Sequence, residues 1–458
     1  MSITIICNSC KKDEFVTGTD ASIYISSDTL KYDTVFTSTG SVTQSFKIFN
    51  PNDKKLRLSD ITLMGGNTSA FNMNVNGQAG TSISNFDINA FDSIYVFVAV
   101  TINPNNQQLP FIISDSIRIA FNGKQQFVQL QAYGQNAHFL RDENIQGNVT
   151  WNNDLPYVIL GGLTIDTTAS LHINAGCRVY AHADAPVLVD GTLEIAGEKN
   201  NEVIFTGDRL DPDYRDLPAS WPGIFLRNSS ADNQFRFAII KNAYQAIVVT
   251  KPAANTTPKL TMHQCIIDNA YNSGIIASST TIKADNTLIS NCGSNIQIIG
   301  GGDYEFTNCT AVCYSNRYAI HDKPVLQLTD YNIENGSIVT NDLTAHFNNC
   351  IFWGDFGSVE DEIVTDNQGT GTFSVNFDNC LYKALNNPQH STFNACLPNQ
   401  DPVFDSVDVS HDYYDFRINN AFSSPAIDNG TLTSFSKDLD DLPRVSGTGT
   451  DIGCYEKQ

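Results

Sequence analysis

The sequence predicts an all-β protein, with an N-terminal β-sandwich followed by a parallel β-helix and a C-terminal cap. Short runs of alternating apolar and polar residues, separated by turn residues, fill the first part of the chain. In the second part the motif Phe-X-Asn-Cys recurs at 306–309, 347–350 and 377–380, which is typical of a stacked solenoid. No segment keeps a 3.6-residue apolar period, so we expect little helix.

The composition narrows the class of partner. The chain has 458 residues and a formal net charge of -22, with only 17% charged residues. An acidic surface repels phosphate backbones, so nucleic acid is excluded as a partner. The same repulsion disfavours anionic polysaccharides unless metal ions bridge them.

Residues 1–18 are interpreted as the remnant of a lipoprotein signal and a tether. A short apolar stretch is followed by Cys10 and a Lys-Lys-Asp-Glu run, which resembles the end of a bacterial lipoprotein signal. The stretch is shorter than usual, lacks a basic start and has Cys7 where Leu is common; a truncated gene start explains all three. We therefore expect lipidation at Cys10, export, and an outer-membrane position facing the cell exterior. The alternative is a charged leader with a chance cysteine.

Residues 19–138 are predicted to form an immunoglobulin-like β-sandwich. The alternating runs 117–121 and 128–132 flank Asn122-Gly123, which is a strong hairpin signal. Strands and turns at this interval over about 115 residues indicate such a sandwich. No catalytic group assembles in this segment, so we interpret it as a spacer.

Residues 139–400 are predicted to form the β-helix. Short β-rich runs end in Gly or Asn, which accept the positive φ of sharp corners. At roughly 20 to 30 residues per coil, the segment holds on the order of ten coils. Five cysteines are expected in one column of buried thiols: Cys265, Cys292, Cys309, Cys350 and Cys380. Individual disulfides remain an alternative, whereas no zinc-type spacing occurs.

Several segments closely resemble secreted bacterial right-handed parallel β-helix repeat proteins of the pectate-lyase-like superfamily. They are 207–216, 221–225, 301–310, 401–404, 424–430, 438–444 and 451–456. The resemblance implies a right-handed β-helix, export, and a C-terminal tail over 401–458. Asp441 and Cys454 depart from the pattern, where Gly and Ala are usual. The superfamily includes pectate lyases and polysaccharide hydrolases, although most members of the family have no assigned function.

No catalytic residue is assigned from the sequence. The Asp series of polygalacturonase-like hydrolases and the arginine motif of the lyases are both absent. The segment from Asp438 to Arg444 is expected to form a cap with an Asp–Arg pair, because solenoid ends need covering. The acidic run 360–362 is expected to be a solvated insertion.

The extended segment 208–216 is the best candidate site for a ligand or calcium. Its members are Asp208, Asp211, Asp213, Tyr214 and Asp216, with Trp221 close behind. Carboxylates at close spacing could hold calcium, and the aromatic rings could stack on a sugar. The alternative is a loop folded onto the β-helix, closed by Arg–Asp pairs, with Trp221 in the core.

These observations favour a non-catalytic cell-surface lipoprotein that displays a β-helix for binding glycan or another surface partner. A polysaccharide lyase or glycoside hydrolase of the β-helix class is the alternative. We expect a monomer with no cofactor unless the 208–216 loop binds calcium. We also expect no membrane contact except through the lipid anchor.

Overall fold

The computed structural model describes residues 14–36, 41–103, 111–255, 257–316, 318, 320–419 and 423–458. Cys10 lies outside the described residues. The chain divides into two compact units, 1–137 with 210–212, and 138–209 with 213–458. The described part is almost entirely β-structure, as predicted, and its one helical element is the short 3-10 turn η1 (Gly66–Thr68). No helix in this part is long and apolar enough to cross a membrane.

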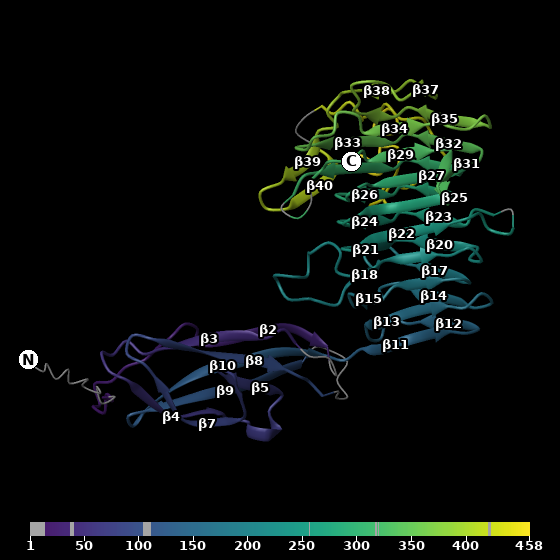
Figure 1. The fold of residues 1–458 in the computed structure, drawn as a ribbon. Coiled ribbons are helices and arrows are strands. Elements are labelled where there is room, and N and C mark those ends of the chain that lie inside the picture. The colour runs from purple at the N-terminus through teal and green to yellow at the C-terminus, as the bar shows by residue number, and fades with distance from the viewer. Residues whose placement is uncertain are drawn as a thin grey trace, which may run out of the picture. The chain divides into compact units, whose positions relative to one another are not determined.

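The first unit contains two five-stranded sheets (Figure 1). One sheet has the order β1 (Tyr24–Ile25), β3 (Gln44–Phe49), β8 (Ser93–Val100), β5 (Phe71–Val75), β6 (Gln78–Ala79). The other has the order β2 (Thr29–Phe36), β10 (Lys124–Gln135), β9 (Phe111–Phe121), β4 (Leu56–Leu63), β7 (Ser82–Ile88). Alternate residues of both sheets enter one buried apolar cluster, which accounts for the period-2 pattern of the sequence.

The second unit is a coiled parallel sheet of 26 strands, from β11 (His138–Ile145) to β38 (Leu397–Pro398). Apart from the last strand of each stack, the strands pair in parallel with a strand one coil later, most often two or three strands further along, and this pairing fits a parallel β-helix. Successive coils lie as layers in Figure 1, and their paired strands form three stacks along the β-helix. The right-handed sense stays a prediction.

The first stack carries the repeated Phe of the sequence motif. It consists of β12 (Asn148–Trp151), β14 (Ser170–Asn174), β17 (Thr192–Ala196), β20 (Asn233–Arg236), β23 (Leu260–His263), the second half of β25 (Ser273–Asp285), the second half of β27 (Ile296–Thr307), β32 (Leu343–Asn348), β35 (Phe373–Asp378) and β37 (Ser391–Asn394).

The second stack follows the first across a sharp corner. It consists of the first halves of β11 and β13 (Tyr157–Ile165), then β15 (Arg178–Ala181), β18 (Val203–Gly207), β21 (Ala238–Lys241), β24 (Ile266–Asp268), β26 (Leu288–Ser290), β28 (Thr310–Tyr314), β33 (Ile351–Asp355), β36 (Leu381–Tyr382) and β38.

The third stack closes each coil. It consists of the second halves of β11 and β13, β16 (Val187–Val189), β19 (Ile224–Leu226), β22 (Gln245–Thr250), the first halves of β25 and β27, β29 (Leu326–Thr329) and β34 (Ile363–Asp366). Two antiparallel hairpins stand outside the coils: β30 (Tyr331–Glu334) with β31 (Ser337–Thr340), and β39 (Phe404–Asp408) with β40 (Tyr413–Ile418).

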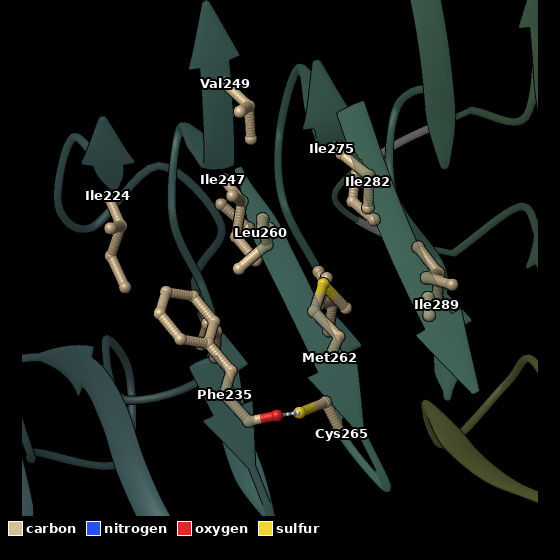
Figure 2. Close-up of a cluster of buried hydrophobic side chains, with 14 of the residues drawn as sticks. Ile224, Phe235, Ile247, Val249, Leu260, Met262, Cys265, Ile275, Ile282 and Ile289 are labelled. Atoms are coloured by element: carbon tan, nitrogen blue, oxygen red, sulfur yellow. Dashed lines mark hydrogen bonds between the residues drawn. The ribbon is translucent and has the colours of Figure 1, made fainter. Parts of the chain in front are cut away.

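Inward-facing side chains of the three stacks form one continuous apolar core. Figure 2 shows part of this core, between Ile224 and Ile289. Aromatic rings stack along it, for example Phe347 on Phe377 with 4.9 Å between centroids. Fully burying a side chain of this size stabilises the fold by roughly 1.5–3 kcal/mol. All nine described cysteines are free thiols.

The expected column of thiols is correct except for one residue. Residues 265, 287, 309, 350, 380 and 396 succeed one another at the corner between the first and second stacks, and all but Thr287 are cysteines. Cys292 instead lies at the next corner, where its carbonyl oxygen accepts a hydrogen bond from the Cys313 thiol at 3.3 Å. Its placement in the first column was therefore wrong.

The C-terminal tail covers the side of the β-helix instead of capping its end. Its apolar residues pack on outward side chains of β26, β28, β33 and β36. Arg444 is buried, but it pairs with Glu456 (Nη1 to Oε2, 3.5 Å) and not with Asp438. Asp438 instead accepts backbone N–H groups of Asp440, Leu442 and Glu456. The expected end cap and its Asp–Arg pair are therefore corrected.

Candidate functional site

The 208–216 loop begins at the end of β18. Asp208 lies against His182, with 2.7 Å between Oδ2 and Nδ1. Burial raises the pKa of the Asp208 carboxyl, although the hydrogen bond from His182 opposes this rise. This carboxylate is therefore already engaged within the fold.

The rest of the loop is held by local pairs and by two asparagines of the β-helix. The Arg209 guanidinium lies 3.7 Å from the centroid of the Tyr214 ring. Arg215 Nε lies 3.0 Å from Asp216 Oδ2. The side-chain amides of Asn242 and Asn269 donate to the carbonyl oxygens of Arg215 and Asp216, at 2.7 and 2.9 Å. These two hydrogen bonds tie the end of the loop to the β-helix, whereas residues 212–216 are exposed.

Trp221 does not present a face to a sugar. Its side chain is 1% exposed, it stacks on Phe205, and its Nε1 donates to the Lys241 carbonyl oxygen at 2.9 Å. The expectation that Trp221 contacts a ligand is therefore corrected. Trp221 has the largest side chain of the segment, and burying it in the apolar core stabilises the fold more than exposing it to solvent would.

The loop carboxylates do not assemble a metal site. Within the described ranges, no group of three or more His, Cys, Asp or Glu side chains is arranged to hold a metal ion. Asp213 and Asp216 are exposed, and Asp211 is partly exposed. The geometry therefore gives calcium no support at this loop.

A lateral groove on the first stack is a better candidate. It consists of two adjoining pockets of about 460 and about 300 Å³, which share Thr281 and Asp303. The larger is lined by Pro252, Ser279, Thr280, Thr281, Gly302, Asp303, Asn341, Asp342 and Thr344. The smaller is lined by Thr257, Pro258, Thr281, Ile282, Lys283, Asp303 and Glu305. We call the two together the lateral groove.

Parallel pairing sets the spacing of the groove's polar groups. Along β25, Thr281 and Lys283 alternate with the buried Ile282, and their partners on β27 are Asp303 and Glu305. Side chains in register on adjacent strands are neighbours at about 4.8 Å. Lys283 Nζ accordingly lies 2.6 Å from Glu305 Oε2, and this hydrogen bond raises the pKa of Lys283.

Three consecutive glycines form a sharp corner beside the larger pocket of the groove. Gly300, Gly301 and Gly302 all have positive φ, and a β-carbon on Gly302 would lie 2.3 Å from the Thr280 carbonyl oxygen. Only glycine fits this approach. Gly302 N donates to the Asp342 carbonyl oxygen at 2.8 Å, which ties the corner to the segment after β31.

The three carboxylates of the groove differ in their partners. Glu305 pairs with Lys283, and Asp342 Oδ1 accepts the Thr372 N–H at 2.7 Å. Asp303 is exposed, and among the described residues its carboxylate has no hydrogen bond or ion pair within the protein. The groove thus offers one free carboxylate amid hydroxyl and amide groups.

A second pair of ionisable side chains, His321 and Glu362, is buried. His321 Nε2 lies 2.8 Å from Glu362 Oε1, and the two side chains are 1% and 0% exposed. Glu362 Oε2 also accepts the Val325 N–H at 3.3 Å. The expectation of a solvated acidic insertion at 360–362 is therefore wrong for Glu362, and this pair serves the fold.

Sequence reasoning did not single out Asp303, Glu305 or Lys283 as site residues. The spacing of the coils in the sequence could have found them, because Lys283 and Glu305 are one coil apart. His263 and Asp285 are also one coil apart, and they too form a pair, with 2.5 Å between Nδ1 and Oδ2. Asp342 could not be found in this way, because the β30–β31 hairpin lengthens its coil.

Comparisons assign the chain to no family. No protein-family model and no curated protein matches it. Among solved structures, the catalytic unit of a GH87 α-1,3-glucanase from Streptomyces thermodiastaticus is similar over 78% of this chain and 88% of that chain, at 10% identity and a TM-score of 0.24.

Two other solved structures match shorter regions. A family 123 glycoside hydrolase from Clostridium perfringens matches over 28% of this chain and 30% of that chain, at 11% identity and a TM-score of 0.19. A PapD-like domain of human CEP192 matches over 30% of this chain and 96% of that chain, at 10% identity and a TM-score of 0.18. Similarity at this level assigns no activity.

Proposed function

We propose that this protein is an exported glycan-binding protein and that the lateral groove is its binding site. The groove carries the proposal: hydroxyl, amide and carboxylate groups line two adjoining pockets on a regular sheet. Such groups match the many hydroxyls of a sugar chain, and polar groups held by a rigid sheet lose little freedom on binding. A chain that follows the groove passes from one coil to the next.

The preferred ligand is a neutral oligosaccharide. Asp303 and Asp342 bring negative charge to the groove, and the chain has a net charge of -22. Both disfavour uronates and sulfated sugars. Asp303, with its free carboxylate, would accept hydrogen bonds from sugar hydroxyls, and such charge-assisted bonds are stronger than neutral ones.

Binding is supported over hydrolysis by the partners of the carboxylates. A glycoside hydrolase needs two carboxyl groups, one as acid and one as base or nucleophile. In the groove, Glu305 is held by Lys283 and Asp342 by the Thr372 N–H, which leaves Asp303 as the free member.

The test is titration calorimetry with neutral gluco-, manno- and xylo-oligosaccharides, with a uronate oligosaccharide for comparison. Asp303→Asn should weaken binding of a neutral ligand about tenfold, the loss of a charged hydrogen bond. The control is Glu194→Gln, which lies on the same outward face several coils away. The proposal fails if no neutral ligand binds, or if both variants weaken binding equally.

A polysaccharide hydrolase is the second candidate, because three carboxylates line the same groove. Release of reducing ends from the neutral panel would establish it. Asp303→Asn and Asp342→Asn should then each abolish release, whereas in a binding protein neither has turnover to lose. A binding protein gives heat of binding with no new reducing ends over many hours.

We further propose that the protein is anchored at the outer surface of the cell by a lipid on Cys10, with the immunoglobulin-like unit as spacer. The proposal rests on the Cys10-Lys-Lys-Asp-Glu run alone. Expression in a Gram-negative host with an intact signal tests it. Cys10→Ala should release the protein from membranes, and protease added to intact cells should degrade the wild type.

A further inference from the structure

The C-terminal end of the β-helix is an open edge. In the described structure β37 pairs with β35 and β38 pairs with β36, and no later strand follows in either stack. Figure 1 shows these two strands as the last layer, with β39 and β40 placed beside earlier layers. Among the described residues, no strand of the tail pairs with this edge.

The last coil buries its inward residues less well than the coil before it. Phe377 and Cys380 are each 0% exposed. Their successors one coil later are Phe393 and Cys396, and both are only partly buried. The apolar core thus reaches the surface at this end, although Phe393 stacks on Phe377 at 4.7 Å.

The last segment of the β-helix lacks charged side chains of its own. Residues 384–400 contain no Asp, Glu, Lys or Arg, in a chain with a net charge of -22. Nearby carboxylates are occupied: Asp378 accepts from Asn394 and His346, and Asp361 accepts the Asn386 N–H. Proteins usually protect open strand edges with charged side chains, and none stands on β37.

The backbone of β37 is suited to pairing with an identical strand. Asn394 directs its carbonyl oxygen toward the preceding coil, where it accepts the Asn379 N–H at 2.9 Å. Because N–H and C=O groups alternate between the two edges of a strand, Ser391 and Phe393 direct theirs toward the open edge.

We infer that two copies of this protein associate end to end, with β37 of each copy paired antiparallel across a twofold axis. We choose a second copy as the partner because β37 carries no charge. Two acidic molecules can therefore meet at this strand without like charges facing each other across the contact. A twofold axis also makes a strand edge complementary to itself. The strands are short, so the dimer is weak and forms in the micromolar range or above.

Sedimentation velocity of the full chain over a wide concentration range tests the inference. The wild type should show a reversible monomer–dimer equilibrium. Thr392→Glu places one extra charge from each copy on the edge strand, and it should raise the dimer dissociation constant at least tenfold. Gln234→Glu is the matched control. Gln234 is exposed on β20, in the middle of the β-helix, so this change should leave the dimer dissociation constant unchanged.

Cross-linking supplies a second test that does not depend on loss of binding. Thr392→Cys should form an intermolecular disulfide on oxidation at concentrations where the dimer is populated, whereas Gln234→Cys should not. A wild type that stays monomeric at the highest concentration overturns the inference. So does a dimer that is unaffected by Thr392→Glu and fails to cross-link at residue 392.

Discussion

Arg444 of the tail donates two hydrogen bonds to Oδ1 of Asn286, at 3.0 Å from Nε and 2.7 Å from Nη2. Asn286 has φ 46° at the corner between β25 and β26, so one residue both turns the chain and binds the tail. Four other residues of this corner column also donate side-chain hydrogen bonds to the tail: Gln264, Asn308, Asn349 and Asn379. The tail is thus an integral part of the β-helix.

Replacing Arg444 should destabilise the β-helix strongly. In Arg444→Met the buried Glu456 loses its cation, and breaking a buried pair costs about 3–5 kcal/mol. The measurement is the free energy of urea unfolding. Lys437→Met is the control, because Lys437 and Asp441 are both about half exposed, and such pairs contribute about 0–1 kcal/mol. Equal losses in the two variants would contradict this role for Arg444.

Glu456 should make the stability of the β-helix depend on pH. Burial raises the pKa of Glu456 from 4.5 to about 7, although N–H groups of Asp451 and Ser446 bond to its carboxylate. The folded state therefore binds this proton more tightly than the unfolded chain. Its stabilising contribution is complete below the unfolded pKa and is lost as the pH rises through about 7.

Comparison with Glu456→Gln isolates this effect. The unfolding free energy of the wild type, minus that of the variant, should fall as the pH rises from 4.5 to above 7. A difference that stays constant or increases over this range would mean that Glu456 keeps its charge in the folded protein.

The corners of the coils explain both the success and the error of the sequence prediction. Each corner needs a residue with positive φ followed by a small inward side chain, and Asn-Cys satisfies both needs. Asn308 and Asn291 have φ 53° and 50°, yet the first lies before the second stack and the second lies after it. The dipeptide therefore predicts a corner correctly but does not say which one.

The candidate site was less accessible to sequence reasoning. Its groups meet only through the pairing of strands one coil apart, and insertions change the coil length. Glu305 and His346 are in register on β27 and β32, but the β30–β31 hairpin lies between them. Glu362 was missed for a related reason: its partner His321 is 41 residues away, and its acidic neighbours suggested a surface loop.

The His321–Glu362 pair should matter for stability in proportion to its burial. In His321→Ala, Glu362 remains at 0% exposure with its imidazole partner gone, and we expect a loss of about 3 kcal/mol or more. His411→Ala removes a similar pair with Asp408, but His411 is 79% exposed, so solvent screens this pair and the loss should be much smaller. Thermal unfolding of the two variants beside the wild type gives the comparison. Similar shifts would show that the buried pair adds nothing specific.

The cysteine column should react with alkylating agents in order of burial, with Cys396 first. Cys396 is partly exposed, and its hydrogen bond with Cys380 lowers its pKa, whereas burial raises the pKa of Cys380 and Cys350 well above the usual value. The thiolate is the reactive form, so both factors favour Cys396. Iodoacetamide at pH 8 should label Cys396 at least tenfold faster than Cys380.

Peptide mass spectrometry of dilute protein follows each site separately and keeps the chains dissociated. Cys396→Ser serves as the control, since Cys380 should stay slow to react if the last coil remains folded without the thiol. Equal labelling of Cys380 and Cys396 in the wild type would show that β37 and β38 open together. The end of the β-helix would then be frayed, and too loose to offer a second copy a fixed edge.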